Sequence, residues 1–425
     1  MIMNRWLLLG IYFITIVLPA QIDFKLFSNL DLAVNQSRLD LDTSDFKILQ
    51  IPVLGFAIST YSNPRISDFI SIKDNALRLN LNDYQLNVDD YSHHLIDVQN
   101  NLFMYQEKYN DNIYSFGLTH RIFSEFIFSK QFISILINGN SNYLNETIYF
   151  SDDCVRAYNY FSLFVGYSRV INDAIQLGGK LRLIKGHNSF GIDNNNSSIL
   201  FSEHFATMEN PFSMHLNSDV NSFITNNTSF LSNVGIAFDL NFSKKTNYLN
   251  LYVDISELGF IHWTEDQYIS QGDFYFDGVD YSLDQTLSSE FSSLYDTIIN
   301  IFDLEEKKDI KSLRLLPFDI NIGVNRGMSN DVGQINFNYN LKKLYKGLLH
   351  TGTISYTQKI IEYQLGITPM YSINKFNYTN FGILINKQWK HTLYTNLYLD
   401  NIFGLFNNIM MSNRFGMGVE FFVLF

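Results

Sequence analysis

Apolar and polar residues alternate along much of this chain, which is the pattern of β-strands with two unlike faces. In residues 233–242, Val234, Ile236, Phe238, Leu240 and Phe242 fall on one face, and Asn233, Gly235, Ala237, Asp239 and Asn241 fall on the other. In a soluble sandwich the apolar face would form the core, whereas in a membrane barrel it would face lipid and the polar face would line the lumen. The pattern alone is compatible with both architectures. In the barrel, Phe238→Arg should be damaging and Asp239→Arg tolerated.

The same interpretation along the whole sequence predicts about fourteen strands, an even number that lets both ends of an antiparallel barrel lie on one side. The expected spans are roughly 46–61, 115–127, 132–150, 157–171, 174–190, 230–243, 247–257, 317–328, 332–341, 348–358, 362–373, 376–388, 392–402 and 413–425. Short polar turns are expected at Ser129-Lys130, Asn172-Asp173, Lys244-Lys245-Thr246, Ser329-Asn330, Gln358-Lys359 and Lys390-His391, all on the side of the C-terminus. The predicted fold class is all-β, a transmembrane antiparallel up-and-down β-barrel.

The C-terminal segment favours the membrane barrel over the soluble sandwich. Residues 415–425 place Phe415, Met417, Val419, Phe421, Val423 and Phe425 on one face, and the chain ends on an aromatic residue. Such a strand pairs with the first strand to close a barrel and turns its apolar face to lipid. We therefore predict that Val419, Phe421, Val423 and Phe425 form a signal for the barrel assembly machinery, with the C-terminus on the periplasmic side.

The N-terminal segment predicts export. A short basic stretch ending at Arg5 precedes the apolar run 6–18, and Pro19-Ala20 supplies a small residue for cleavage. A membrane anchor is the alternative, but about 13 apolar residues are fewer than the ~20 that span a bilayer. Residues 1–20 are therefore predicted to be a signal peptide, and residues 21–425 a single barrel domain.

Three long insertions, near 62–114, 191–229 and 258–316, interrupt the strands and are expected on the outer side. Residues 284–308 are predicted to contain a helix, because apolar residues recur at helical spacing; these are Leu287, Phe291, Leu294, Tyr295, Ile298 and Phe302. A weaker pattern of the same kind predicts a second short helix near 90–106. The longer helix could cover the barrel mouth, act as a lid or plug in the lumen, or dock a partner.

Composition supports this class and excludes others. Aromatic residues make up 16% of the chain, as a lipid face with two aromatic girdles requires, and a count of 6 prolines suits long paired strands. The net charge of -12 argues against nucleic acid as a partner. Trp263 and Trp389, with Tyr394 and Tyr398, are interpreted as girdle residues rather than a ligand cage.

No motif predicts catalysis, a metal or a cofactor. His93 and His94 are adjacent, whereas helical metal ligands are three or four residues apart. The acidic stretch Asp152-Asp153 and the run 193–198 fit solvated turns, since the latter lacks the final Glu of a calcium loop. The nucleophile elbow G-x-S-x-G is absent. We therefore predict no enzyme activity and no cofactor.

Several segments resemble a family of Gram-negative outer-membrane barrels of unknown function. They include I-P-V-L-G-F-A-I-S-T-Y-S-N (51–63), V-G-Y-S-R-V-I-N-D-A-I-Q-L-G-G-K-L-R (165–182), D-I-S-E-L-G-F-I-H-W (254–263), F-Y-F-D-G-V-D (274–280) and N-L-Y-L-D-N-I-F-G-L-F-N (396–407). The resemblance implies a barrel similar to the FadL-like hydrophobic-solute channels and to the accessory barrels of type IX secretion. It implies no particular activity.

Three functional hypotheses follow. The first is a passive pore or channel-like barrel in the outer membrane, because about fourteen strands enclose a wider lumen than eight. The second is a structural or assembly barrel that docks a surface or secretion complex through its outer insertions. The third is an enzyme acting on lipids or surface glycans, for which no motif is found. The lipid bilayer is the one partner that every barrel version requires.

Overall fold

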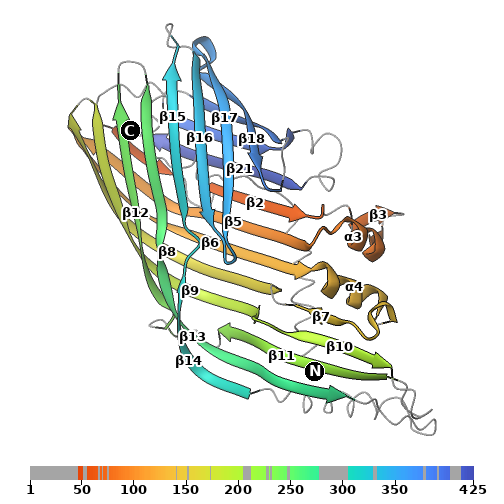
Figure 1. Ribbon diagram of the computed structural model, residues 1–425. Coiled ribbons are helices and arrows are strands. Elements are labelled where there is room, and N and C mark those ends of the chain that lie inside the picture. The colour runs from red at the N-terminus through yellow and green to blue at the C-terminus, as the bar shows by residue number, and fades with distance from the viewer. Residues whose placement is uncertain are drawn as a thin grey trace.

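The computed structural model describes residues 46–425, except for 51–54, 66–67, 69, 74–75, 140, 151–152, 173, 204–211, 226–228, 230–231, 247–248, 277–304, 329–332, 377–379, 390–391 and 403–412. The predicted signal peptide and the predicted helix near 284–308 lie outside the described residues. Figure 1 shows a large curved sheet whose strands run at different tilts around one lumen.

Within the described residues, fourteen antiparallel strands close the barrel, counting β1 and β2 as one, so the predicted fold class is confirmed. In order they are β1 (Phe46–Gln50) with β2 (Gly55–Asn63), β5 (Tyr91–Tyr109), β6 (Asn112–Ser129), β8 (Cys154–Asn172), β9 (Ile175–Asn194), β12 (Val234–Lys245), β13 (Asn250–Phe276), β15 (Asp319–Gly327), β16 (Gly333–Lys343), β17 (Leu348–Ile360), β18 (Leu365–Asn374), β19 (Asn380–Trp389), β20 (Leu393–Asp400) and β21 (Arg414–Leu424).

The last strand closes the barrel against the first, as predicted. β21 pairs antiparallel with β1 and β2 as well as with its sequence neighbour β20. The backbone of Phe425 itself exchanges two hydrogen bonds with Lys47, at 2.8 and 3.3 Å. Every strand of the barrel wall therefore has a partner on each side, which removes the exposed edges that would aggregate.

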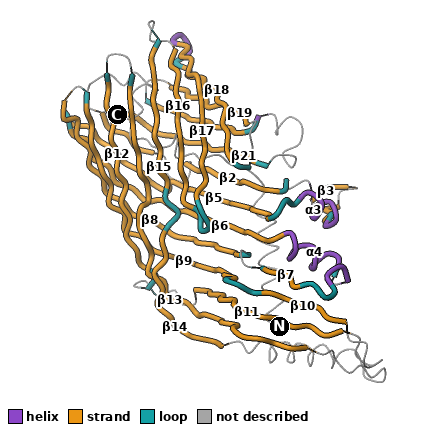
Figure 2. The backbone as a smooth tube through the Cα atoms, in the orientation of Figure 1, coloured by secondary structure: helices purple, strands orange, loops and turns teal. Residues whose placement is uncertain are grey.

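The two ends of the barrel differ in their connections. One end carries the C-terminus and the short connections β5–β6, β8–β9, β12–β13, β15–β16, β17–β18 and β19–β20; we call it the turn end. The other, the loop end, carries α3 (Leu81–Asn87), α4 (Lys130–Asn138) and the strands outside the barrel wall, which are β3 (Ile70–Lys73), β4 (Ala76–Leu79), β7 (Thr147–Tyr149), β10 (Ser198–Glu203), β11 (Phe212–Thr225) and β14 (Glu305–Leu315). Figure 2 shows both α-helices together at this end.

The predicted helix near 90–106 is wrong, because this segment is the strand β5. Its pairing with β6 shifts between Asn101 and Phe103, which marks a β-bulge. Before the bulge Leu95 and Asp97 are buried, and after it Met104 and Gln106 are buried. A bulge moves the inward residues from odd to even positions. The shifted alternation imitates helical spacing when it is read from the sequence.

The predicted strand 132–150 is also wrong, since its first half forms α4. The Ser129 hydroxyl caps this helix by accepting from the Phe132 amide at 3.3 Å, and Gly139 ends it with φ of 72°. Ser129-Lys130 is therefore a helix start at the loop end rather than a turn beside the C-terminus. One strand was missed at 90–106 and one was wrongly predicted at 132–150, so the predicted number of strands is still fourteen.

The predicted insertions 191–229 and 258–316 are partly strand. β13 continues beyond the barrel wall and pairs there with β11 on one side and β14 on the other. The predicted turns near 172 and 244 fall at the turn end, and the turn predicted at Gln358-Lys359 lies slightly further along, at Ile361–Tyr363. The turns predicted at Ser329-Asn330 and Lys390-His391 lie outside the described residues.

The outer wall is apolar. Its exposed side chains include Leu163, Val165, Leu181, Leu183, Phe238, Leu240, Leu258, Phe260, Phe337 and Ile354. A closed barrel with such an exterior is the outer-membrane type of transmembrane β-barrel. Among the described residues, no helix is long and apolar enough to cross a bilayer.

Candidate functional site

Seven charged side chains meet inside the barrel and cross its lumen. They are Asp97, Arg121, Arg182, Asp239, Glu257, Asp319 and Lys342, and we call this set the ionic layer. Each comes from a different strand, and all are buried or nearly so. A buried charge needs a partner and hydrogen bonds to avoid a large desolvation cost.

Arg121 is the centre of the ionic layer. Its guanidinium donates to both carboxylate oxygens of Asp97, from Nε at 2.7 Å and Nη2 at 2.6 Å. Its Nη1 donates to the Pro317 carbonyl oxygen at 3.0 Å and also to the Glu257 carboxylate. The planar guanidinium can make these contacts together because its donors have a fixed fork geometry.

Glu257 reaches the lumen through a bulge in β13. The pairing of β12 with β13 shifts between Phe238 and Leu240, so Ser256 and Glu257 together lie opposite Asp239. Glu257 has φ of 58°, a conformation rare for residues other than glycine. The Tyr160 hydroxyl donates to its carboxylate at 2.9 Å. The bulge thus adds an inward carboxylate that strict alternation would have turned outward.

Arg182 and Asp239 form the edge of the ionic layer on β9 and β12. Arg182 Nε lies 2.8 Å and Nη2 2.5 Å from the Asp239 carboxylate oxygens, and Asp239 also accepts from the Glu257 amide at 2.8 Å. The sequence correctly places Asp239 on the lumen face and Phe238, 48% exposed, on the lipid face. The premise that Asp239 points into water is wrong, because Asp239 is buried and pairs with Arg182, so we now expect Asp239→Arg to be damaging.

Lys342 shows that the lumen is crossed. Its ammonium Nζ lies 2.7 Å from Asp97 Oδ2 and 3.6 Å from Asp319 Oδ1. Asp97 is on β5 and Lys342 on β16, and these strands lie on opposite sides of the barrel order. Side chains from opposite walls can touch only where the walls and their side chains fill the space between them.

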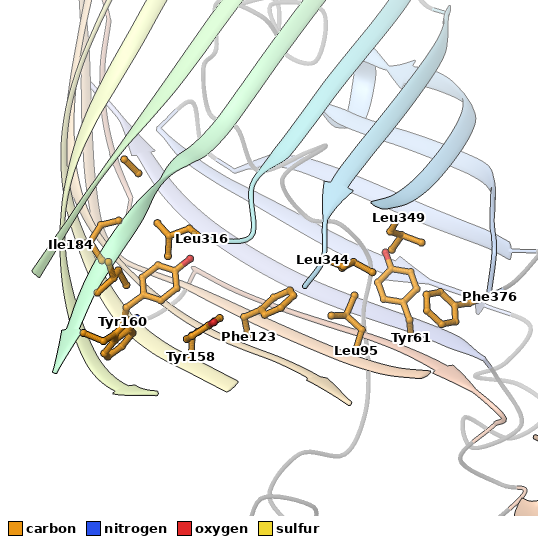
Figure 3. Packing of buried hydrophobic residues seen from close by; sticks show 13 residues of the cluster. Tyr61, Leu95, Phe123, Tyr158, Tyr160, Ile184, Leu316, Leu344, Leu349 and Phe376 are labelled. Carbon is orange, nitrogen blue, oxygen red and sulfur yellow. The ribbon is translucent and has the colours of Figure 1, made fainter. Parts of the chain in front are cut away.

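A second layer lies directly toward the loop end and is apolar. It comprises Tyr61, Leu95, Phe123, Tyr158, Tyr160, Ile184, Ala237, Ile261, Trp263, Leu316, Leu344, Leu349 and Phe376, and we call it the apolar layer. Figure 3 shows these side chains pointing toward one another from strands around the lumen. Tyr158 and Trp263 are stacked with ring centroids 6.1 Å apart. Trp263 is 1% exposed, and Tyr394 and Tyr398 are also buried, so these three are not girdle residues; Trp389 is exposed.

The short connection between β16 and β17, residues 344–347, places Leu344 in the lumen and joins the two layers. Leu344 lies in the apolar layer, beside Lys342 of the ionic layer. The Tyr345 amide donates to Glu125 Oε2 at 2.7 Å, and the guanidinium carbon of Arg156 lies 4.1 Å from the centre of the Tyr345 ring. Partial burial raises the pKa of the Tyr345 phenol. We call residues 342–349 the inner hairpin.

The adjacent histidines have separate roles on the two faces of β5. His93 faces inward, with Nε2 2.9 Å from Glu125 and Nδ1 3.2 Å from the Lys375 ammonium. His94 faces outward and contacts the Ser62 hydroxyl at 2.9 Å and the Tyr84 hydroxyl at 3.0 Å. Burial lowers the pKa of Lys375, which lies just beyond β18. No cluster of metal-ligating side chains occurs among the residues that the structure describes.

The predicted assembly residues lie where the alternation places them. Val419, Phe421 and Val423 are half-buried on the outer face, Phe425 is 70% exposed, and Glu420 and Phe422 between them are buried inside. Their role as a signal stays a prediction. The predicted lid residues, Leu287 to Phe302, lie outside the described residues.

The sequence interpretation missed the ionic layer as a site. It put Asp97 in a helix and Glu257 at the end of a strand, and it treated lumen-facing charges as solvated. One signal was available in the sequence: the positions expected to face the lumen include Arg182, Asp239 and Asp319, which carry charges of both signs. That pattern favours mutual pairing over a uniformly charged pore, but it does not reveal which strands meet.

Comparisons with known proteins gave matches to solved structures and to one family model. Solved structures that match at low similarity include the toluene transporter TbuX of Ralstonia pickettii, with 8% identity, a TM-score of 0.38 and coverage of 90% of this chain and 89% of that one. The toluene transporter TodX of Pseudomonas putida matches with 9% identity, a TM-score of 0.39 and coverage of 93% of this chain and 92% of that one. The translocator domain of the autotransporter NalP of Neisseria meningitidis matches with 6% identity, a TM-score of 0.31 and coverage of 92% of this chain and 91% of that one.

No curated protein matches the chain. One family model does, over residues 41–397, which is most of the sequence and nearly all of the barrel. The resemblance noted from the sequence motifs is thereby confirmed. The chain belongs to the family of unknown function DUF5723.

Proposed function

We propose that this protein is a channel-type barrel of the Gram-negative outer membrane whose lumen is closed in the conformation described. The contact between Lys342 and Asp97 carries this proposal, because it joins opposite walls across the lumen. The apolar layer lies beside the ionic layer in the same lumen, and we infer that the two layers together close it to solutes. Solutes would pass passively, once the inner hairpin moves away from β2, β5 and β6.

The two layers suggest why opening is energetically accessible. A buried ion pair contributes little net stability, because Coulomb attraction is offset by desolvation. Water entering the ionic layer would rehydrate these charges as the pairs separate. The main cost is re-exposure of apolar hairpin residues such as Leu344 and Leu349, about 1.5–3 kcal/mol for each leucine. Such a cost leaves the open state as a minor population that a bound solute can increase.

The test is conductance of the purified protein in planar bilayers. Asp97→Asn combined with Lys342→Met removes the cross-lumen pair with little change in volume. We expect rare openings from the wild type and frequent or sustained openings from the double variant. Glu306→Gln with Lys308→Met is the control, since this exposed pair lies on β14 beyond the barrel wall. Equal, silent records from all three proteins would overturn the channel proposal.

The alternative function, a structural or assembly barrel that docks a surface or secretion complex, predicts the silent result. It would also require a stoichiometric partner after cross-linking in outer membranes. We favour transport over this role and over catalysis, because the ionic layer of the described chain lies across the lumen, where it would control passage.

We also infer that the turn end faces the periplasm and that the C-terminal strand is read by the barrel assembly machinery. Short turns at the end that bears the C-terminus match the periplasmic side of outer-membrane barrels. Phe425→Lys should block assembly, because it charges the lipid-facing end of the closing strand. Phe422→Leu, on the inward face, should assemble normally. A heat-modifiable Phe425→Lys barrel in the outer membrane would reject the signal role.

A further inference from the structure

The lumen between the ionic layer and the turn end has one wall of uncharged polar side chains. On β15 to β19 the inward-facing polar residues there are Asn321, Asn325, Gln334, Asn336, Asn338, Asn340, Thr351, Ser355, Thr357, Thr368, Ser372, Asn380 and Asn386. We call this set the amide wall. Among the described inward-facing residues of these five strands, none is charged between the ionic layer and the rim at Lys359.

The amide wall has hydrogen-bonding capacity that the described protein does not use. Asn340 Nδ2 donates to Asn321 Oδ1 at 2.7 Å, and the two residues are direct partners in the pairing of β15 with β16. This leaves Asn321 Nδ2 as a donor and Asn340 Oδ1 as an acceptor, side by side and without a partner. Asn321 is 1% exposed and Asn340 0%.

The same situation recurs along the amide wall. Asn338 Oδ1 accepts from the Tyr252 hydroxyl at 2.9 Å, while Asn338 Nδ2 has no partner. Asn325 Oδ1, Thr351 Oγ1 and Asn380 Oδ1 are likewise unsatisfied and buried. Each buried polar group left unpaired costs about 1–3 kcal/mol. Donors and acceptors are mixed, so the groups would be satisfied by something that both donates and accepts.

Other lumen side chains offer an apolar surface. Ile48, Met104, Phe164, Tyr394 and Phe422 form a buried cluster on β1, β5, β8, β20 and β21. The Tyr394 and Phe422 rings are parallel within 3°, with centroids 5.3 Å apart. The lumen toward the turn end therefore combines an uncharged polar wall with an aromatic and aliphatic one, and the buried carboxylates of Asp400 on β20 and Glu420 on β21 lie between them.

We propose that the amide wall binds an uncharged polyhydroxylated solute of the sugar class. Hydroxyl groups donate and accept at once, and a sugar ring also has C–H faces that suit aromatic surfaces. The amide wall itself has no charge to pair with a carboxylate or an ammonium group. The nearest buried charges are the carboxylates of Asp400, to which Asn380 donates, and of Glu420, to which Asn396 donates, and both already accept hydrogen bonds from the protein. A hydrocarbon would leave the amides unpaired. This inference rests on the proposed channel function and assigns its solute class.

The first test compares solutes that differ in charge but not in carbon skeleton. Liposomes that contain the Asp97→Asn/Lys342→Met variant are assayed by swelling in glucose, sodium gluconate and N-methylglucamine chloride. We expect glucose to enter about tenfold faster than either ion, the ratio that corresponds to roughly 1.4 kcal/mol. Equal rates for the three solutes, or slower entry of glucose, would overturn the assignment.

The second test removes the amide pair. Asn321→Leu with Asn340→Leu, added to the opened variant, should abolish the preference for glucose. Ile322→Leu with Tyr339→Leu is the matched control, because these residues are partners in the same strand pair but face outward. A preference that survives in the Asn321→Leu/Asn340→Leu protein would place the selectivity elsewhere.

The third measurement does not need an open channel. Maltose is titrated into the purified wild-type protein in detergent and into the Asn321→Leu/Asn340→Leu protein, and binding is followed by calorimetry. We expect binding to the wild type and at least a tenfold loss in the variant, about 1.4 kcal/mol. Maltose binding with silent bilayers would retain the sugar site and reject the channel. Conductance in bilayers without maltose binding and without a preference for glucose would retain the channel and reject the sugar site.

Discussion

The ionic layer and the apolar layer lie next to each other across one lumen, yet they close it by different physics. The ionic layer has directional contacts that only particular partners can make, such as the two-point contact of Arg121 with Asp97. The apolar layer has contacts that many side chains of similar volume could make. The ionic layer therefore specifies which strands meet, and the apolar layer supplies stability and excludes water.

The largest expected effect is loss of one member of the ionic layer. Arg121→Met leaves Asp97 and Glu257 buried without their main partner, which should destabilise the barrel by about 3–5 kcal/mol. Urea unfolding in lipid vesicles measures this change. Adding Asp97→Leu and Glu257→Leu to Arg121→Met should recover much of the loss, since no uncompensated charge remains. No recovery would mean that the ionic layer itself supplies stability.

Phe238 and Asp239 extend the comparison to the outer wall, because they are neighbours on β12 with opposite faces. Phe238→Arg puts a charge into lipid and should cost about 2–4 kcal/mol near the midplane. Asp239→Arg should also be damaging, because it sets two guanidinium groups together beside Arg182. Phe238→Leu and Asp239→Asn are the controls, and each should cost less stability than the arginine substitution at the same position. A fully stable Asp239→Arg barrel would contradict the closed lumen.

The apolar layer should respond more gently at the inner hairpin. Leu344→Ala removes packing against the layer and should lower unfolding free energy by about 2–3 kcal/mol, because the hairpin can shift to fill the space. It should also raise open probability in bilayers. Leu348→Ala is the control, because Leu348 is an exposed residue of the same inner hairpin, at the start of β17. Destabilisation without any change in opening would separate the hairpin from the gate.

The smallest effect is expected for an ion pair outside the lumen. Lys47 Nζ and Glu107 Oε1 are 3.0 Å apart, but their side chains are 55% and 32% exposed. Solvent and salt screen such a pair, so Lys47→Ala should leave stability and conductance unchanged. The same measurements as for Arg121→Met make the contrast direct. A comparable loss in Lys47→Ala would show that burial is not what distinguishes the ionic layer.

The regular strands and their two faces could be predicted from the sequence. The faces of Phe238 and Asp239, the closing strand 415–425 and the turns near 172 and 244 follow from local alternation and turn chemistry. Prediction failed where the alternation changes phase, at the bulge after Asn101, and where Ser129 caps a helix whose residues also alternate. Both failures arise because short segments fit two periodicities and only pairing partners decide between them.

The sequence by itself determined the class of the molecule: an outward apolar face, an inward polar face and a closing aromatic strand are local properties of alternating residues. The tertiary structure alone decided that the inward residues touch. Asp97 and Lys342 are 245 residues apart in sequence, and nothing local to either strand indicates the other. Their contact depends on how closely the walls approach and on the bulges that aim each side chain, which are properties of the closed sheet.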